Sequence, residues 1–134
     1  MKHCKLEADV SSLSTLISFL EVELEREEIS VKIVNQMFIV AEEIFVNIAH
    51  YAYAKRGMVD IFLEINAEIR QIEMTFQDSG IPFDPLAKPD ADITLSSEER
   101  GIGGMGILMV KKMTDSLSYR FENGNNILHL KKRF

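Results

Sequence analysis

Three polar residues in the segment AEEIFVNIAHYAY, namely Glu43, Asn47 and His50, stand at positions i, i+4 and i+7. On a helix these positions share one face, so the three side chains would point in the same direction. An amide oxygen such as that of Asn47 can ligate a hard cation that also holds phosphate oxygens. A carboxylate one turn away can accept the proton of an attacking hydroxyl. The spacing therefore allows magnesium-dependent phosphoryl chemistry, although a solvated polar face is the commoner cause of such a pattern.

A glycine cluster in ERGIGGMGILMVKK places Gly101, Gly103 and Gly106 at the spacing G-x-G-x-x-G. In a dinucleotide-binding fold this turn follows a buried strand and opens a βαβ unit. The preceding segment DITLSSEER is too polar for such a strand, and the chain ends at residue 134, soon after Gly106. The cluster instead precedes a predicted helix. Either the free N–H groups of that helix hold phosphate, or the glycines form a flexible hinge.

A third motif, FQDSGIPFDP, places Asp78 at the end of a predicted strand and Gly80 two residues later. A carboxylate at a strand end can accept a hydrogen bond from an exocyclic amine. Glycine would leave the neighbouring space open for a flat ring. Asp and Gly are also common in ordinary β-turns, so this motif alone is a weak signal.

The composition bounds the class of protein. The chain has 134 residues, enough for one domain, with 15 Lys and Arg against 21 Asp and Glu and a net charge of −6. An acidic domain without a basic run argues against nucleic-acid binding. Cys4 is the only cysteine, which excludes an internal disulfide and fits a reducing compartment. With no signal-peptide pattern and no apolar run of about 18–20 residues, we expect a cytoplasmic protein without a membrane span.

Hydrophobic periodicity predicts the helices that must position the three motifs. Apolar residues recur at helical spacing in 9–28 and in 31–54, and we expect Gly57 to end the second helix. Residues 104–115 form a third predicted helix. Its methionine stripe, expected to pack in the core, consists of Met105, Met109 and Met113.

The remaining segments alternate apolar and polar residues, as strands do. Residues 58–66 and the run ending at Asp78 form a predicted antiparallel hairpin with a two-residue connection, AE. Residues 116–122 and 126–134 form a second pair of strands around NGN, and residues 4–8 form an edge strand. The order β-α-α-β-β-loop-α-β-β predicts an α+β fold. It is a two-layer sandwich in which helices cover one face of a mixed, mostly antiparallel sheet.

The three motifs in this order resemble the GHKL, or Bergerat-fold, ATPases. The pattern is E-x-x-x-N on a helix, then D-x-G-x-P-F-D-P after a hairpin, then G-G-x-G opening a helix. Among these proteins the short chain is most similar to the anti-sigma-factor serine/threonine kinases of the RsbW/SpoIIAB type. The resemblance covers nearly the whole chain. It implies a single histidine-kinase-like ATPase domain over residues 1–134, with the sandwich fold expected from the element order.

The resemblance also implies roles for the residues of the first two motifs. Asn47 corresponds to the asparagine that ligates Mg²⁺ between the phosphates, and Glu43 corresponds to the general base. Asp78 corresponds to the aspartate that reads the adenine amino group, with Gly80 as its companion. His50 either contacts phosphate or caps the site, because Tyr51 stands where the best-known members carry a basic residue.

The glycine box of the family corresponds to Gly104 and Gly106, with Met105 between them. Gly101 and Gly103 correspond to the flexible segment that leads into this box.

The resemblance also covers the long polar segment before the box. Residues 84–100 correspond to the ATP lid, and we expect them to be mobile without ligand because they can bury few apolar side chains. Arg100 could reach a phosphate. If a threonine of the last strand normally touches the nucleotide, Asn126 would have to serve in its place.

The implied function is an ATP- and Mg²⁺-dependent serine/threonine kinase that acts as an anti-sigma factor. Its partners would be a STAS-type anti-anti-sigma factor, a sigma factor or both, and the resemblance allows a homodimer. The alternative is a non-catalytic ATP-binding module that sequesters a protein partner. A sensor histidine kinase fragment fits less well, because the first predicted helix carries no histidine that could be phosphorylated.

Overall fold

A computed structural model describes residues 1–53, 57–87 and 104–134 of the chain. Within these ranges, single turns of 3-10 helix at Val10–Ser12 and Pro85–Ala87 accompany three helices and five strands. The helices are α1 (Leu13–Arg26), α2 (Val31–Tyr51) and α4 (Gly104–Met113). The strands are β1 (Lys2–Glu7), β2 (Met58–Asn66), β3 (Gln71–Asp78), β4 (Ser116–Glu122) and β5 (Asn125–Arg133).

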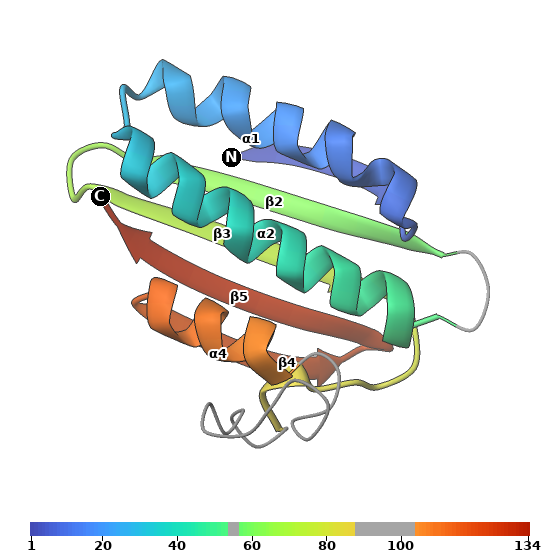
Figure 1. The fold of residues 1–134 in the computed structure, drawn as a ribbon. Coiled ribbons are helices and arrows are strands. Elements are labelled where there is room, and N and C mark those ends of the chain that lie inside the picture. The colour runs from blue at the N-terminus through green and yellow to red at the C-terminus, as the bar shows by residue number, and fades with distance from the viewer. Residues whose placement is uncertain (54–56, 88–103) are drawn as a thin grey trace.

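The five strands form one sheet in the order β1-β2-β3-β5-β4, and all four pairings are antiparallel. The three helices lie over the same face of this sheet, as Figure 1 shows. The predicted α+β two-layer sandwich is therefore confirmed. The sheet goes further than the prediction, because every pairing in the described ranges is antiparallel rather than only most of them.

The core lies between the sheet and the helices. Strict alternation along β2 and β3 turns one set of side chains towards the helices, and the register pairs Ile61 with Phe76 and Leu63 with Met74. α1 adds a leucine stripe at helical spacing, and α2 adds a row of apolar residues. The helix residues fully buried in this core are Leu16, Leu20, Leu24, Met37, Val40, Ala41 and Phe45.

α2 is the element that carries Glu43 and Asn47. Its first turn is capped by the Ser30 hydroxyl, which accepts a hydrogen bond from the Ile33 N–H at 3.4 Å. The helix ends at Tyr51, so the predicted end at Gly57 is wrong. The carbonyl of Ala52 accepts a hydrogen bond from the Ile81 N–H at 2.9 Å, which draws the chain out of the helix and onto the end of β3.

Two turns set the strand register. β2 and β3 are joined by residues 67–70, a four-residue connection rather than the two predicted, because the Asn66 side chain accepts hydrogen bonds from two N–H groups inside the turn. β4 and β5 meet at Asn123 and Gly124, both with positive φ, as a two-residue hairpin turn requires. On its other side β5 pairs with β3, where Asn126 lies directly opposite Asp78.

α4 packs on α2 through Ile107 and Val110, which are 5% and 1% exposed. Met109 is 38% exposed, so the prediction that the methionine stripe packs in the core is wrong at this position. The apolar side chains of Ile107 and Val110, three residues apart, occupy the buried face of α4, so Met109 lies on the exposed face.

Among the described residues, no helix combines the length and the hydropathy that a membrane crossing needs.

Candidate functional site

Only three polar side chains are buried in the described part of the chain, and all three line the same pocket. Asn47, Asp78 and Asn126 are 6%, 4% and 5% exposed. Burying polar groups is unfavourable unless hydrogen bonds or a ligand satisfy them, so the gathering of three such groups makes this pocket the candidate functional site. The rest of the lining is mainly apolar: Ile44, Ile48, Ala52, Phe76, Phe83, Pro85, Ile107, Tyr119 and Leu128.

Asn47 and Glu43 are joined on α2 as their spacing predicts. The Asn47 side-chain N–H groups donate to the Glu43 backbone carbonyl at 2.9 Å and to Glu43 Oε1 at 3.1 Å. With the amide nitrogen turned towards Glu43, the carbonyl oxygen Oδ1 faces away and accepts from no residue that the structure describes. Asn47 therefore presents a buried oxygen acceptor at the pocket wall, next to a carboxylate.

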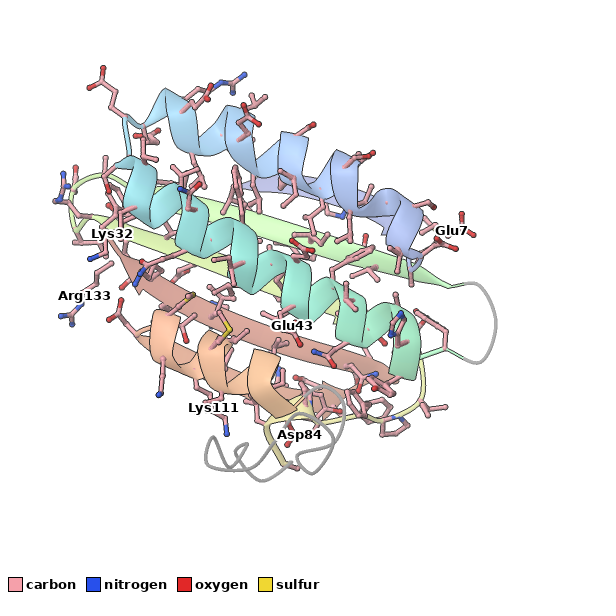
Figure 2. All side chains as sticks on the ribbon, in the orientation of Figure 1. Glu7, Lys32, Glu43, Asp84, Lys111 and Arg133 are labelled. Carbon is pink, nitrogen blue, oxygen red and sulfur yellow. The ribbon has the colours of Figure 1, made fainter. Side chains whose placement is uncertain are left out.

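Glu43 also lies against the first turn of α4, and Figure 2 shows its side chain between α2 and that helix. A Cβ placed on Gly106 would overlap the Glu43 carboxylate, so only glycine leaves room for this carboxylate here. The N-terminal turn of α4, with its free N–H groups, therefore begins beside the Glu43 and Asn47 pair. The arrangement brings a carboxylate, an amide oxygen and a helix N-terminus together.

These groups fit a magnesium ion that arrives with phosphate oxygens. No three His, Cys, Asp or Glu side chains in the described ranges form a cluster that could hold a metal. The Oδ1 of Asn47, which accepts from no described residue, is a hard oxygen ligand. Mg²⁺ commonly takes one or two protein oxygens and completes its shell with substrate phosphates and water. The residues present therefore suit a metal bound together with a nucleotide.

Asp78 lies across the pocket, at the end of β3. Its Oδ1 accepts hydrogen bonds from the Gly80 N–H and from Asn126 Nδ2, both at 2.9 Å. Burial raises the pKa of the Asp78 carboxyl above its ordinary value, while these two hydrogen bonds act to lower the pKa. The second oxygen, Oδ2, accepts from no described residue and is left for a ligand that donates a hydrogen bond.

Gly80 has a steric role that its sequence motif does not reveal. A Cβ on Gly80 would overlap the backbone carbonyl of Ala52. The expectation that Gly80 also leaves space for a flat ring stays a prediction. The φ angle of Gly80 is not in the left-handed region, so the requirement is for space rather than for backbone conformation. Gly80 thus fixes how α2 meets the end of β3.

We expect Gly80→Ala to lower the free energy of unfolding by about 1–3 kcal/mol, the usual range for an overpacked site. The Ala52 carbonyl is backbone and already accepts from the Ile81 N–H, so it cannot turn away. Urea unfolding followed by circular dichroism measures the change. Ile81→Ala is the control, since Ile81 is 63% exposed and its loss should change stability by less than about 0.5 kcal/mol. Equal stability of the two variants would contradict the prediction.

The structure does not bring His50 to the three buried polar residues. His50 is exposed at the end of α2 and lies edge-on to Tyr51, with ring centroids 6.2 Å apart. Tyr51, which replaces the expected basic residue, stacks on Phe83 with centroids 5.3 Å apart. Phe83 lines the pocket, so Tyr51 supports its wall. A phosphate contact by His50 stays a prediction.

The glycine box is described only in part. Gly104 begins α4 and Gly106 lies in its first turn, with Met105 between them. Arg100, Gly101 and Gly103, together with most of the expected lid, fall outside the described residues. Of residues 84–100, only 84–87 are described; Asp84 Oδ1 accepts from the Leu86 N–H at 2.8 Å, and Pro85 lines the pocket.

Sequence reasoning missed Tyr119 and Phe83 as pocket residues and gave Asn126 only a conditional role. These residues reach the pocket through strand pairing and the chain after β3. One signal was available for Asn126. It stands in phase with Leu128 and Leu130, on the buried side of an alternating strand where a polar residue is unusual.

The sequence matches the histidine kinase-like ATPase domain family over residues 6–132. The chain belongs to this family. Membership confirms the resemblance to the GHKL ATPases and implies ATP as the nucleotide. A search of curated proteins found no significant match.

Fourteen chains of solved structures match the fold. One holds the RsbU and RsbW domains of Rv1364c from Mycobacterium tuberculosis, with a TM-score of 0.68 and 12% sequence identity. The match covers 99% of this chain and 32% of the solved chain, so this chain spans about a third of the length of that solved chain. At this identity the likeness supports the fold predicted for the RsbW type.

Proposed function

We propose that this ATPase-family domain is a magnesium-dependent serine/threonine protein kinase that acts as an anti-sigma factor. The observation that carries the proposal is the gathering of Asn47, Asp78 and Asn126 around one pocket, with the Glu43 carboxylate at the start of α4. The RsbW domain in a structure of similar fold supports the regulatory part. The protein acted upon would be a STAS-type anti-anti-sigma factor.

The pocket suits the adenine base. Its apolar walls, with Ile48, Phe76 and Leu128 among them, would hold a flat ring and exclude water. Asp78 Oδ2 would accept a hydrogen bond from the exocyclic amine. A nucleobase with a carbonyl oxygen at this position would place an acceptor against Asp78 Oδ2, which is also an acceptor, and would bind more weakly than adenine.

The phosphates would extend from the pocket towards the first turn of α4, where free N–H groups favour anions. Asn47 Oδ1 would hold the metal, which when bound would supply neutralisation of phosphate charge and orientation of the terminal phosphoryl group. Glu43 would take the proton of the incoming serine or threonine hydroxyl. As that oxygen bonds to the γ-phosphorus, the bond to the bridging oxygen breaks and ADP leaves.

Positioning and charge neutralisation provide most of the rate in phosphoryl transfer, so these few groups suffice. The placement of Glu43 favours a kinase over the non-catalytic binding module. The Glu43 carboxylate lies beside the Asn47 amide and against the first turn of α4. If these groups hold the metal and the phosphates, the carboxylate would be within reach of the incoming hydroxyl. The cytoplasmic location and the homodimer that the resemblance allows stay predictions.

The proposal is tested by Asn47→Ala in isothermal titration calorimetry with ATP, with and without Mg²⁺. We expect Mg²⁺ to strengthen ATP binding to the wild type. Loss of Asn47 removes an oxygen ligand to a charged group, so affinity should fall about 10–100-fold and its dependence on Mg²⁺ should disappear.

Asn35→Ala is the matched control, because Asn35 is an exposed asparagine of the same helix and should leave binding unchanged. A wild-type protein that binds no adenine nucleotide would overturn the proposed function. Equal Mg²⁺ dependence in the wild type and Asn47→Ala would remove Asn47 from the metal site.

A further inference from the structure

Asn126 has every hydrogen-bonding position of its side chain filled. Its Nδ2 donates to Asp78 Oδ1 at 2.9 Å and to the Ile81 carbonyl at 2.8 Å. Its Oδ1 accepts from the Phe83 N–H at 3.0 Å and from the Tyr119 hydroxyl. A primary amide has two N–H donors and two acceptor lone pairs, so this buried residue offers nothing further to a ligand.

The saturated amide leaves Asn126 unable to replace a threonine hydroxyl that touches the nucleotide. It faces Asp78 across the β3–β5 ladder and holds one oxygen of that carboxylate. The same amide ties the Ile81 and Phe83 backbone, which follows the motif of Asp78 and Gly80, to the sheet. One residue therefore links the base-reading acid, a pocket wall and two strands.

We propose that Asn126 is a positioning residue that sets base selectivity, by occupying Asp78 Oδ1 so that Oδ2 alone faces the pocket as an acceptor. The inference rests on the proposed nucleotide site and deepens it. Gly80 N–H is the second donor to Oδ1, and the two bonds together fix the carboxylate plane. A ligand that donates an amine hydrogen is thereby selected over one that does not.

The protonation of Asp78 provides a readout that a merely structural role would not move. The Asn126 hydrogen bond favours the ionised carboxylate, so its loss should raise the pKa of Asp78 beyond the increase that burial causes. ATP binding that needs the carboxylate is lost as the pH falls through this pKa, so the variant should lose binding at a higher pH than the wild type.

Other groups near Asp78 do not produce this shift. Tyr119 of β4 interacts with Asp78 and Asp84, and burial raises the pKa of its phenol, so it stays neutral through the acidic range. Glu43, the acid of α2 nearest the site, lies against Gly106 of α4. The protonation of free ATP is the same in both titrations, so it does not contribute to the difference in pH profile between the two proteins.

The experiment is calorimetric titration of wild type and Asn126→Ala with ATP and with inosine triphosphate, which lacks the exocyclic amine, between pH 5 and pH 8. We expect the variant to bind ATP about 10–100-fold more weakly, to lose much of its preference for ATP over inosine triphosphate, and to show an acid limit at higher pH. Asn125→Ala, at the neighbouring position on the other side of the strand, should behave as the wild type.

The outcomes separate this inference from the proposed function. A wild type that binds neither nucleotide defeats the proposed function. A wild type that binds ATP, matched by Asn126→Ala in affinity, preference and pH profile, overturns the role of Asn126 alone.

If Asn126→Ala does not fold, nitrogen-15 NMR of the wild type tests the inference instead. The Asn126 side-chain N–H signals should exchange slowly with water and shift as Asp78 titrates. Fast exchange without a shift would overturn the inference.

Discussion

Glu43→Gln is expected to lower phosphoryl transfer by about 10²–10⁴-fold, the usual contribution of a general base, while ATP binding stays nearly normal. Glutamine keeps the size of the side chain and can still accept the Asn47 N–H bond through its carbonyl oxygen. It cannot accept the proton of the attacking hydroxyl. The change therefore removes basicity and leaves the geometry between α2 and α4 in place.

Single-turnover transfer from labelled ATP measures this effect, with the STAS-domain proteins of the same genome as phosphate acceptors. Single-turnover conditions are needed because slow product release could hide a chemical defect. Glu42→Gln is the matched control: Glu42 is the preceding glutamate of α2, and its side chain is exposed. Transfer by Glu43→Gln at the wild-type rate would mean that Glu43 is not the base.

The same assay decides between the kinase and the binding module. If the wild type binds a partner in an ATP-dependent manner and transfers phosphate to none, the domain is a binding module and Glu43 has a structural role. If the wild type transfers phosphate and only Glu43→Gln fails, the kinase proposal stands. Calorimetry with ATP on both proteins shows whether a lost rate reflects chemistry or binding.

The fold could be predicted from the sequence because its signals are local. Alternation in 58–66, the leucine spacing of α1 and the NGN turn each follow from residues that are close along the chain. The errors occurred where distant segments decide. Nothing local to Tyr51 reveals that the Ala52 carbonyl will bond to the Ile81 N–H and end α2 early.

The residues of the candidate site were likewise predictable where they lie close together in the sequence, and not where they come from distant segments. Glu43 and Asn47 share a helix, so the fixed geometry of one turn makes their pairing readable from spacing alone. Asp78 and Asn126 are 48 residues apart and meet only because β5, rather than β4, pairs with β3. Sheet order of this kind depends on packing across the whole core. The steric role of Gly80 could not be predicted for the same reason, since its neighbour Ala52 follows α2, far away in the sequence.

Gly106→Ala is expected to reduce phosphoryl transfer by about 10²-fold or more without destabilising the protein. A Cβ at this position would overlap the Glu43 carboxylate, which ends a flexible side chain and can swing aside. The fold should therefore tolerate the change, and alanine favours the helix over glycine by up to about 1 kcal/mol. Displacing a catalytic group by about 1 Å commonly costs a factor of about 10² in rate. Stability should stay equal or rise while activity falls.

A double-mutant cycle identifies the cause of this loss. Glu43→Ala removes the carboxylate and opens the space that the new Cβ needs, so adding Gly106→Ala to it should cost little further activity. The alternative is that alanine blocks the approach of phosphate to the first turn of α4. In that case the two losses would add, and Gly106→Ala alone would weaken ATP binding in calorimetry. Additive losses together with weaker binding would show that Gly106 makes room for the nucleotide rather than for Glu43.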